Sequence, residues 1–285
     1  MAQTMFITTI ALLLGVFLLE NNHRAIAKKF EYTIAEGDIL THAHNLEDAE
    51  AELERIAQGQ PWNDREGDNR PNRTKRATEQ MRWNGGVLPY AFSSDLTQDQ
   101  IDAILQAHAW MEQYTCIQFV EHTNENDYVV YVDGGTSYCG ASYIGRIGGG
   151  QPIYIGDNCA YAFVVVHEIL HALGVFHEQS RQDRDSYVVI HTENIESGTE
   201  HNFDLHQIWY INNYNMEYLY QSVMHYHSYA FSTNQEKTIT ANVNQQMYIN
   251  NQYVHAGDYD KINLIYECGF TIGGQQTNHV VEVIS

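Results

Sequence analysis

Three histidines and one glutamate between positions 167 and 177 have the residue types and the spacing of a zinc site. His167 and His171 are four residues apart, so on a helix both rings lie on the same face. Glu168 stands beside the first ring and can reach a metal-bound water without ligating the metal. His177 follows ten residues after His167. On a continuous helix it would lie about 15 Å along the axis, too far to share an ion.

Gly174 allows the chain to turn back between His171 and His177. Glycine adopts positive φ without steric cost, so it can end the helix and return His177 to the same ion. Two helical histidines alone are also found in cores and on surfaces, but the added glycine and third histidine favour a metal site. Three imidazoles leave one coordination position open for water, as in a catalytic zinc ion. We therefore expect one Zn²⁺ per chain, bound by His167, His171 and His177.

The elements that must position these residues are indicated by hydrophobic periodicity and by caps. An apolar run at 161–173 carries the first two histidines and predicts a buried helix. Thr97 and Gln100 have the pattern of a capping box, so a second helix is expected to begin there. His108 lies on its apolar face and is interpreted as a core residue. Strands are expected at 87–92, 117–120, 128–132 and 152–156. Pro152 favours an edge position for the last strand, and we expect an extended substrate to add to the sheet there.

The first 76 residues differ in character from those that follow. An apolar run at 7–19 precedes a small-x-small site at Ala25 and Ala27, which is typical of a secretory signal; a buried element at the start of a domain is the alternative. A basic cluster at 73–76 ends a polar stretch and favours proteolytic processing over an ordinary linker. The expected divisions are a signal peptide (1–27), a propeptide (28–76), a globular domain (77–270) and a short tail (271–285).

The overall charge narrows the range of partners. The 285 residues include 36 acidic and 15 basic side chains, which gives a formal net charge of −21. This excess of acid argues against binding to nucleic acid or to an anionic membrane, because both select basic patches. A hydrophobic content of 44% fits a packed globular protein. Export would place the four cysteines in an oxidising compartment, where disulfides are the default.

A methionine turn after the histidines strengthens the metal-site interpretation, because such a turn lies beneath the zinc ligands of metzincins. His225 and His227, in and beside it, are interpreted as neighbours of the site or surface residues, since three ligands are already present. Further motifs extend over about residues 82–268. They are Arg82-Trp83-x-Gly85-Gly86-Val87-x-Pro89-Tyr90, the zinc motif continued through His177-Glu178-Gln179-Ser180-Arg181, Ser222-Val223-Met224-His225-Tyr226, and Asp258-Tyr259-Asp260 with the Ile262, Asn263 and Tyr266 that follow. In these segments the sequence resembles the astacin family of zinc endopeptidases.

The resemblance implies an α+β fold of the metzincin type, with two lobes around a cleft. The N-terminal lobe would contain a twisted mixed β-sheet and the zinc-motif helix, and the C-terminal lobe would be irregular. The implied roles are zinc ligation for His167, His171 and His177, a further swinging ligand that stabilises the oxyanion for Tyr226, the base of the site for Met224, and an anchor for the mature N-terminus for Glu178. Glu168 is expected to be the general base.

The resemblance also bears on the cysteines and on latency. Four cysteines allow three pairings, and the family pattern implies Cys116–Cys268 and Cys139–Cys159. Astacin propeptides place an aspartate on the zinc ion, and Asp38, after Gly37, is expected to be that latency ligand.

These observations together predict a secreted, extracellular zinc metalloendopeptidase that is made as a zymogen. We expect a monomer that acts on protein or peptide substrates, with no nucleic-acid or membrane partner. An activating protease would cut near Arg76, or alternatively after Arg73. The competing hypothesis is a non-catalytic zinc-binding module on the same fold, in which Glu168 would be expected to be lost first.

Overall fold

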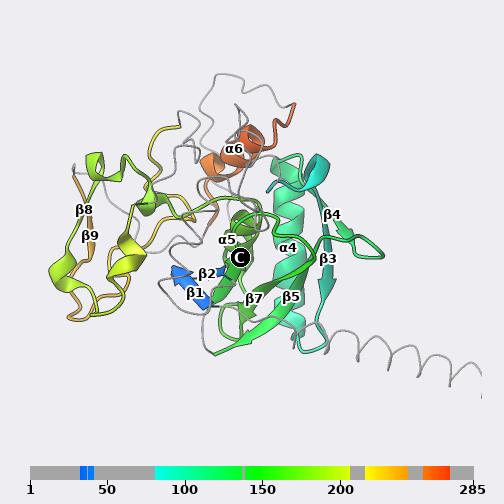
Figure 1. Ribbon diagram of the computed structural model, residues 1–285, viewed down its shortest axis with the longest axis horizontal. Coiled ribbons are helices and arrows are strands. Elements are labelled where there is room, and N and C mark those ends of the chain that lie inside the picture. The colour runs from blue at the N-terminus through cyan, green and yellow to red at the C-terminus, as the bar shows by residue number, and fades with distance from the viewer. Residues whose placement is uncertain are drawn as a thin grey trace, which may run out of the picture.

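The computed structural model describes residues 33–36, 38–41, 81–136, 139–205, 216–242 and 253–269 (Figure 1). The expected signal peptide, both expected processing sites and the expected tail at 271–285 lie outside the described residues. Within the described part of the chain, no helix has the length and hydrophobicity needed to cross a bilayer.

A mixed sheet of seven strands forms the centre of the fold, in the order β1-β2-β6-β7-β5-β3-β4. The strands are β1 (Thr33–Glu36), β2 (Ile39–Thr41), β3 (Val87–Phe92), β4 (Gln118–Glu121), β5 (Tyr128–Gly135), β6 (Gly140–Tyr143) and β7 (Gly150–Gly156). β1 pairs antiparallel with β2, and β6 pairs antiparallel with β7. The other neighbours are parallel. Two strands from the expected propeptide therefore continue the sheet of the expected catalytic domain.

The expectation that the strand at 152–156 lies at an edge is wrong. β7 is an interior strand between β5 and β6. The antiparallel ladder with β6 runs from Ile153 to Ile155 and stops before Pro152, so the missing N–H of the proline interrupts no bond of that ladder. The strand that borders the propeptide is β6, which pairs in parallel with β2.

Two long helices pack against one another beside the sheet (Figure 1). α4 (Gln98–Tyr114) begins at the expected capping box, in which Thr97 and Gln100 each bind the other's backbone N–H. α5 (Ala162–Ala172) carries the zinc motif and buries most of its length. Hydrophobic side chains from β3, β5, β7, α4 and α5 form one core, so both helices are held rigidly against the sheet. His108 of α4 lies in this region, buried, stacked on Phe119 and hydrogen-bonded to the Tyr131 hydroxyl.

The chain after α5 is mostly irregular, and the expected α+β class with an irregular C-terminal part is confirmed. It contains short 3₁₀ turns and the antiparallel pair β8 (Val188–Ile190) and β9 (Ile239–Ala241), which has a hydrophobic cluster of its own. A last helix, α6 (Ala256–Ile265), follows. In Figure 1, β8 and β9 lie far from α4 and the central sheet, while α6 lies close to the end of α5.

Two disulfides tie these parts together, and both have the pairing that the resemblance implies. Cys116 is bonded to Cys268, which joins the start of β4 to the end of α6 across 152 residues. Cys139 is bonded to Cys159 across 20 residues, and this bond brackets β6 and β7. Because a longer closed loop restricts the unfolded chain more, the first bond has the larger expected effect on stability.

Candidate metal centre

α5 presents His167 and His171 on one face, one helical turn apart, as the sequence predicts. Their Nε2 atoms are 3.1 Å from each other. The helix ends where Gly174 adopts φ +101°, and its N–H donates to the His171 carbonyl. This turn brings the Nε2 atom of His177 to 3.3 Å from that of His167. The three rings therefore meet at one point, although His177 lies beyond the helix.

The protonation of these rings leaves the correct nitrogen atoms available to a metal. The Nδ1 atom of His167 lies 2.7 Å from the Val223 carbonyl, and that of His171 lies 2.8 Å from the Val175 carbonyl. A carbonyl can only accept, so each Nδ1 carries the proton and each Nε2 lone pair points at the common centre. Burial lowers the pKa of His171 to about 4, which also favours the neutral ligating form.

The spacing of these nitrogen atoms fits zinc. For Zn–N bonds of about 2.0–2.1 Å, the edge of a coordination tetrahedron is about 3.3–3.4 Å long. The observed Nε2 separations of 3.1 and 3.3 Å are close to this edge. Two unprotonated nitrogen atoms cannot hydrogen-bond to each other, and a cation between them would make this approach favourable. The donor set is therefore complete for one zinc ion.

Asp38 occupies the fourth position around this centre. Its carboxylate oxygens lie 3.1 Å from the Nε2 atom of His167, 3.3 Å from that of His171 and 3.0 Å from that of His177. The four side chains together form a group that could hold one metal ion. Burial raises the pKa of Asp38, but the interactions with the nearby rings of His177 and His167 outweigh it and hold this pKa well below the usual range. The Ser142 N–H donates to the Asp38 carbonyl at 2.9 Å, which fixes the residue against β6.

Glu168 points into the same site from α5. It is buried, and its Oε2 atom has no hydrogen-bond partner among the described residues. Burial raises the pKa of Glu168 well above its usual range, and the charge of Asp38 raises it further. A carboxylate left without a partner beside three ligands is poised to bind a small polar molecule there. Gly140 of β6 makes room for it, since a Cβ atom at that position would lie 2.2 Å from Oε1.

The methionine turn lies under the ligands and is held by α6. Met224 is fully buried. Asp258 of α6 accepts hydrogen bonds from the Ser222 hydroxyl and from the Val223 N–H, the latter at 3.0 Å. The Val223 carbonyl is the one that orients His167. Tyr226 follows the turn, and its ring centroid lies 4.7 Å from that of His177.

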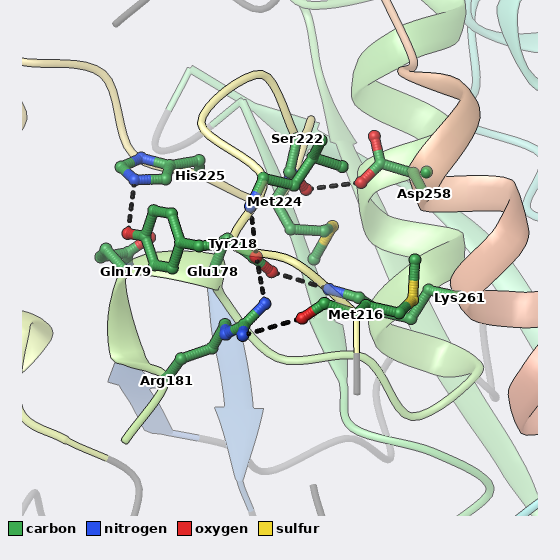
Figure 2. A network of polar contacts seen from close by, with 12 residues as sticks. Glu178, Gln179, Arg181, Met216, Tyr218, Ser222, Met224, His225, Asp258 and Lys261 are labelled. Carbon is green, nitrogen blue, oxygen red and sulfur yellow. Dashed lines mark hydrogen bonds and ion pairs between the residues drawn. The ribbon is translucent and has the colours of Figure 1, made fainter. Parts of the chain in front are cut away.

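Glu178, expected to anchor a new N-terminus, is buried and already carries three hydrogen bonds (Figure 2). Its Oε1 atom accepts from Arg181 and from the Leu219 N–H, and its Oε2 atom accepts from Lys261. The charges of Lys261 and Arg181 lower the pKa of Glu178 although burial alone would raise it. The anchor role stays a prediction, since residues 77–80 lie outside the described part of the chain.

The two additional histidines, His225 and His227, contact other groups than the metal centre. His225 is buried and hydrogen-bonded to the Tyr218 hydroxyl at 2.7 Å and to the Tyr226 carbonyl. His227 is exposed and accepts from the Tyr229 N–H. Neither belongs to the metal-binding group that the described residues form.

Three further residues support the site and were not identified from the sequence: Gly140, Asp258 and Lys261. Gly140 is adjacent to a cysteine in a segment without a strand pattern. Asp258 and Lys261 are three residues apart, so the sequence indicates that they share one polar face of a helix. Their partners lie 36 and 83 residues away in sequence, and periodicity says nothing about such distant pairs.

Three imidazoles whose Nε2 atoms converge, a carboxylate at the fourth position and a buried glutamate beside them are the groups of a zinc hydrolase site. The family model of astacin, a family of peptidases, matches residues 75–267. The zinc metalloproteinase nas-14 of Caenorhabditis elegans is 38% identical over 188 residues, which are 66% of this chain and 37% of that protein. Human tolloid-like protein 1 is 40% identical over 171 residues, which are 58% and 17% respectively.

A solved structure agrees with these sequence matches. High choriolytic enzyme 1, a hatching-enzyme zinc protease of the medaka fish Oryzias latipes, has a TM-score of 0.60 and 36% identity; the match covers 66% of this chain and 93% of that one. The chain belongs to the astacin family. It spans about two fifths or less of the length of the curated relatives named above.

Proposed function

We propose that this chain is a zinc-dependent endopeptidase that is made as an inactive precursor and exported. The observation that carries the proposal is the position of Asp38, whose carboxylate stands within 3.0–3.3 Å of all three ligating nitrogen atoms. A substrate and its attacking water need that position. A residue from the expected propeptide therefore blocks a site that is otherwise complete.

The chemistry follows from the ligands and from Glu168. A bound zinc ion would acidify a water molecule and polarise the scissile carbonyl. Glu168 would take the proton from that water and deliver it to the leaving amine, because its side chain interacts with Asp38 and has an unpaired oxygen. Tyr226, beside His177, would donate its hydroxyl proton to the developing oxyanion.

The sheet suggests where a substrate would bind. β2 covers β6 through the parallel register Ile39↔Ser142 and Leu40↔Tyr143, and both Ile39 and Leu40 are buried. Once this strand has left, the backbone N–H and C=O groups of β6 face an open edge next to the metal. An extended protein or peptide substrate can then add to β6 as a strand.

The domain divisions belong to the same proposal. We assign the signal peptide to residues 1–27, the propeptide to 28–76, the astacin-like protease domain to 77–270 and a tail to 271–285, with an activating cut after Arg76. The use of all four cysteines in disulfides supports an oxidising, extracellular location. We further propose that the mature enzyme is a monomer.

Substitution of the general base tests the catalytic assignment. The full chain would be activated by limited proteolysis, and Glu168→Gln compared with the unchanged protein on a quenched-fluorescent peptide library. Glu236→Gln is the matched control, since Glu236 is exposed and far from the ligands in sequence. We expect Glu168→Gln to retain one zinc ion and to lose activity by at least about 100-fold, the usual contribution of a general base.

Two results would contradict this assignment. Turnover by Glu168→Gln equal to that of the control would remove Glu168 from the mechanism. An activated, zinc-loaded unchanged protein that cleaves no peptide in the library would favour the non-catalytic zinc-binding module instead.

A further inference from the structure

A buried cluster of ion pairs surrounds Glu178, the residue after the third zinc ligand (Figure 2). Glu178 follows His177 in the chain, and its side chain is 1% exposed. Its Oε2 atom accepts from the Lys261 ammonium at 2.7 Å, and its Oε1 atom accepts from Arg181 at 2.8 Å and from the Leu219 N–H at 2.9 Å. A carboxylate so deeply buried needs a counter-charge, because its desolvation is expensive.

Arg181 supplies only part of that counter-charge, because it is shared between Glu178 and a second carboxylate. Its Nε and one terminal nitrogen form a bidentate pair with Asp183 at 2.9 and 2.8 Å. Its remaining donors reach Glu178 and the carbonyls of Met216 and Glu217. All five donors are therefore occupied, and the pair with Asp183 is neutral by itself. The second positive charge at Glu178 is that of Lys261, whose side chain is 13% exposed.

Lys261 connects this cluster to the rest of the site through α6. It lies three residues after Asp258, and Figure 2 shows both side chains on that helix, Lys261 directed at Glu178 and Asp258 at Ser222. Glu178 in turn donates its backbone N–H to the Met224 carbonyl at 2.9 Å. One helix thus holds both the methionine turn and the residue that follows the third ligand.

We propose that Lys261 is the positioning residue that holds Glu178, and through it His177, in place before and after removal of the propeptide, without help from a free N-terminus. This inference deepens the proposed function and rests on it for the role of His177 as a ligand. It differs from the expectation that Glu178 waits for an N-terminal ammonium, because both carboxylate oxygens already have a partner inside the domain.

Zinc release from the uncut full chain tests this directly, because no new N-terminus exists there. The zinc-loaded unchanged protein would be compared with Lys261→Met and Lys261→Arg by release of the metal to a chromogenic chelator. Lys237→Met is the matched control, since Lys237 is an exposed lysine of the same chain. We expect about ten-fold faster release from Lys261→Met, the lower end of the effect of residues that orient ligands. Lys261→Arg and Lys237→Met should stay within about two-fold of the unchanged protein.

A double variant separates loss of the charge pair from general damage to the fold. In Lys261→Met the buried carboxylate of Glu178 has lost one of its two positive partners, whereas Glu178→Gln with Lys261→Met removes both charges of the pair. We expect the double variant to release zinc more slowly than Lys261→Met alone. Release from Lys261→Met at the unchanged rate, or a Lys261→Arg variant as fast as Lys261→Met, would overturn the proposal.

Activity of the cut enzyme tests the independence from the N-terminus. Mature forms beginning at Thr74 and at Ala77 would be prepared from the unchanged chain and from Lys261→Met. We expect the two unchanged forms to agree in kcat/KM within about three-fold, and Lys261→Met to be lowered equally in both. A strong dependence on the starting residue in the unchanged enzyme would overturn the proposal. If the unchanged enzyme cleaves nothing, the proposed function fails, while the zinc-release result still decides the role of Lys261.

Discussion

Gly140→Ala is the substitution that most directly probes the space around the general base. Gly140 opens β6 and lies against the Glu168 side chain. An added Cβ atom would stand 2.2 Å from Oε1, 2.7 Å from Cδ and 2.8 Å from Cγ of that glutamate. Ordinary contact begins at 3.4 Å, so the carboxylate must move by about 1.2 Å. Both groups are buried, so the carboxylate cannot simply move out into solvent.

The displacement of the Glu168 carboxylate gives an expected loss of catalytic rate. A misplacement of about 1 Å in a catalytic group costs about 100-fold, which corresponds to about 2.7 kcal/mol in the activation free energy. We therefore expect kcat/KM of activated Gly140→Ala to fall by about 100-fold. Zinc content should not change, because the three atoms nearest to the added Cβ atom all belong to Glu168, which is not a metal ligand.

The assay is hydrolysis of a quenched-fluorescent peptide at saturating zinc, with zinc content measured on the same samples. Gly269→Ala is the matched control, since an added Cβ atom there meets nothing within 4 Å. An activity of Gly140→Ala within two- or three-fold of this control would refute the argument that β6 reserves space for the Glu168 carboxylate.

Two further predictions concern latency and pH. Asp38→Ala should make the uncut chain at least about ten-fold more active on small peptides, because the fourth position around the metal is then open. If the uncut variant and the uncut unchanged chain are both inactive, β2 alone blocks the site. Burial holds the pKa of His108 at about 3 in the folded protein, against about 6.5 unfolded. Between these values only the unfolded chain takes up the proton, so stability falls as the pH falls from about 6.5 towards 3. His108→Gln should flatten this fall in urea titrations, and an unchanged pH dependence would contradict the assignment.

The features that could be predicted from the sequence are those set by local spacing. The i and i+4 histidines, the turn at Gly174 and the capping box at Thr97 depend on residues less than a few turns apart, and the structure has all three. β6 could not be predicted, because Gly140, Ala141 and Ser142 lack the β-branched or aromatic side chains that mark a strand. Its pairing with β7 and β2 makes it a strand, and that pairing is a property of the whole sheet.

The same reasoning explains the error at Pro152 and the missed support from α6. Pro152 lacks a backbone N–H and so cannot donate a hydrogen bond at its own position. The sequence does not show that the ladder between β6 and β7 ends one residue away, at Ile153. Glu178 was recognised through the family resemblance of the motif that contains it, whereas its partner Lys261 is 83 residues distant. The packing of the folded chain decides which charged residues form such a pair. The sequence can therefore indicate one partner through its local motif, but not the distant partner.

The place of Asp38 in the chain has a consequence for how activity would develop after the cut. Asp38 precedes Arg76 by 38 residues, and the proposed cleavage there would break neither its contacts with the three imidazoles nor the pairing of β2 with β6. The cut would change only the effective concentration of the proposed blocking strand, from on the order of millimolar when tethered to that of the free peptide. Dilution, or digestion of the released peptide, would then set the onset of activity. A concentrated solution of cut enzyme would remain inhibited by its own propeptide and would become active on dilution.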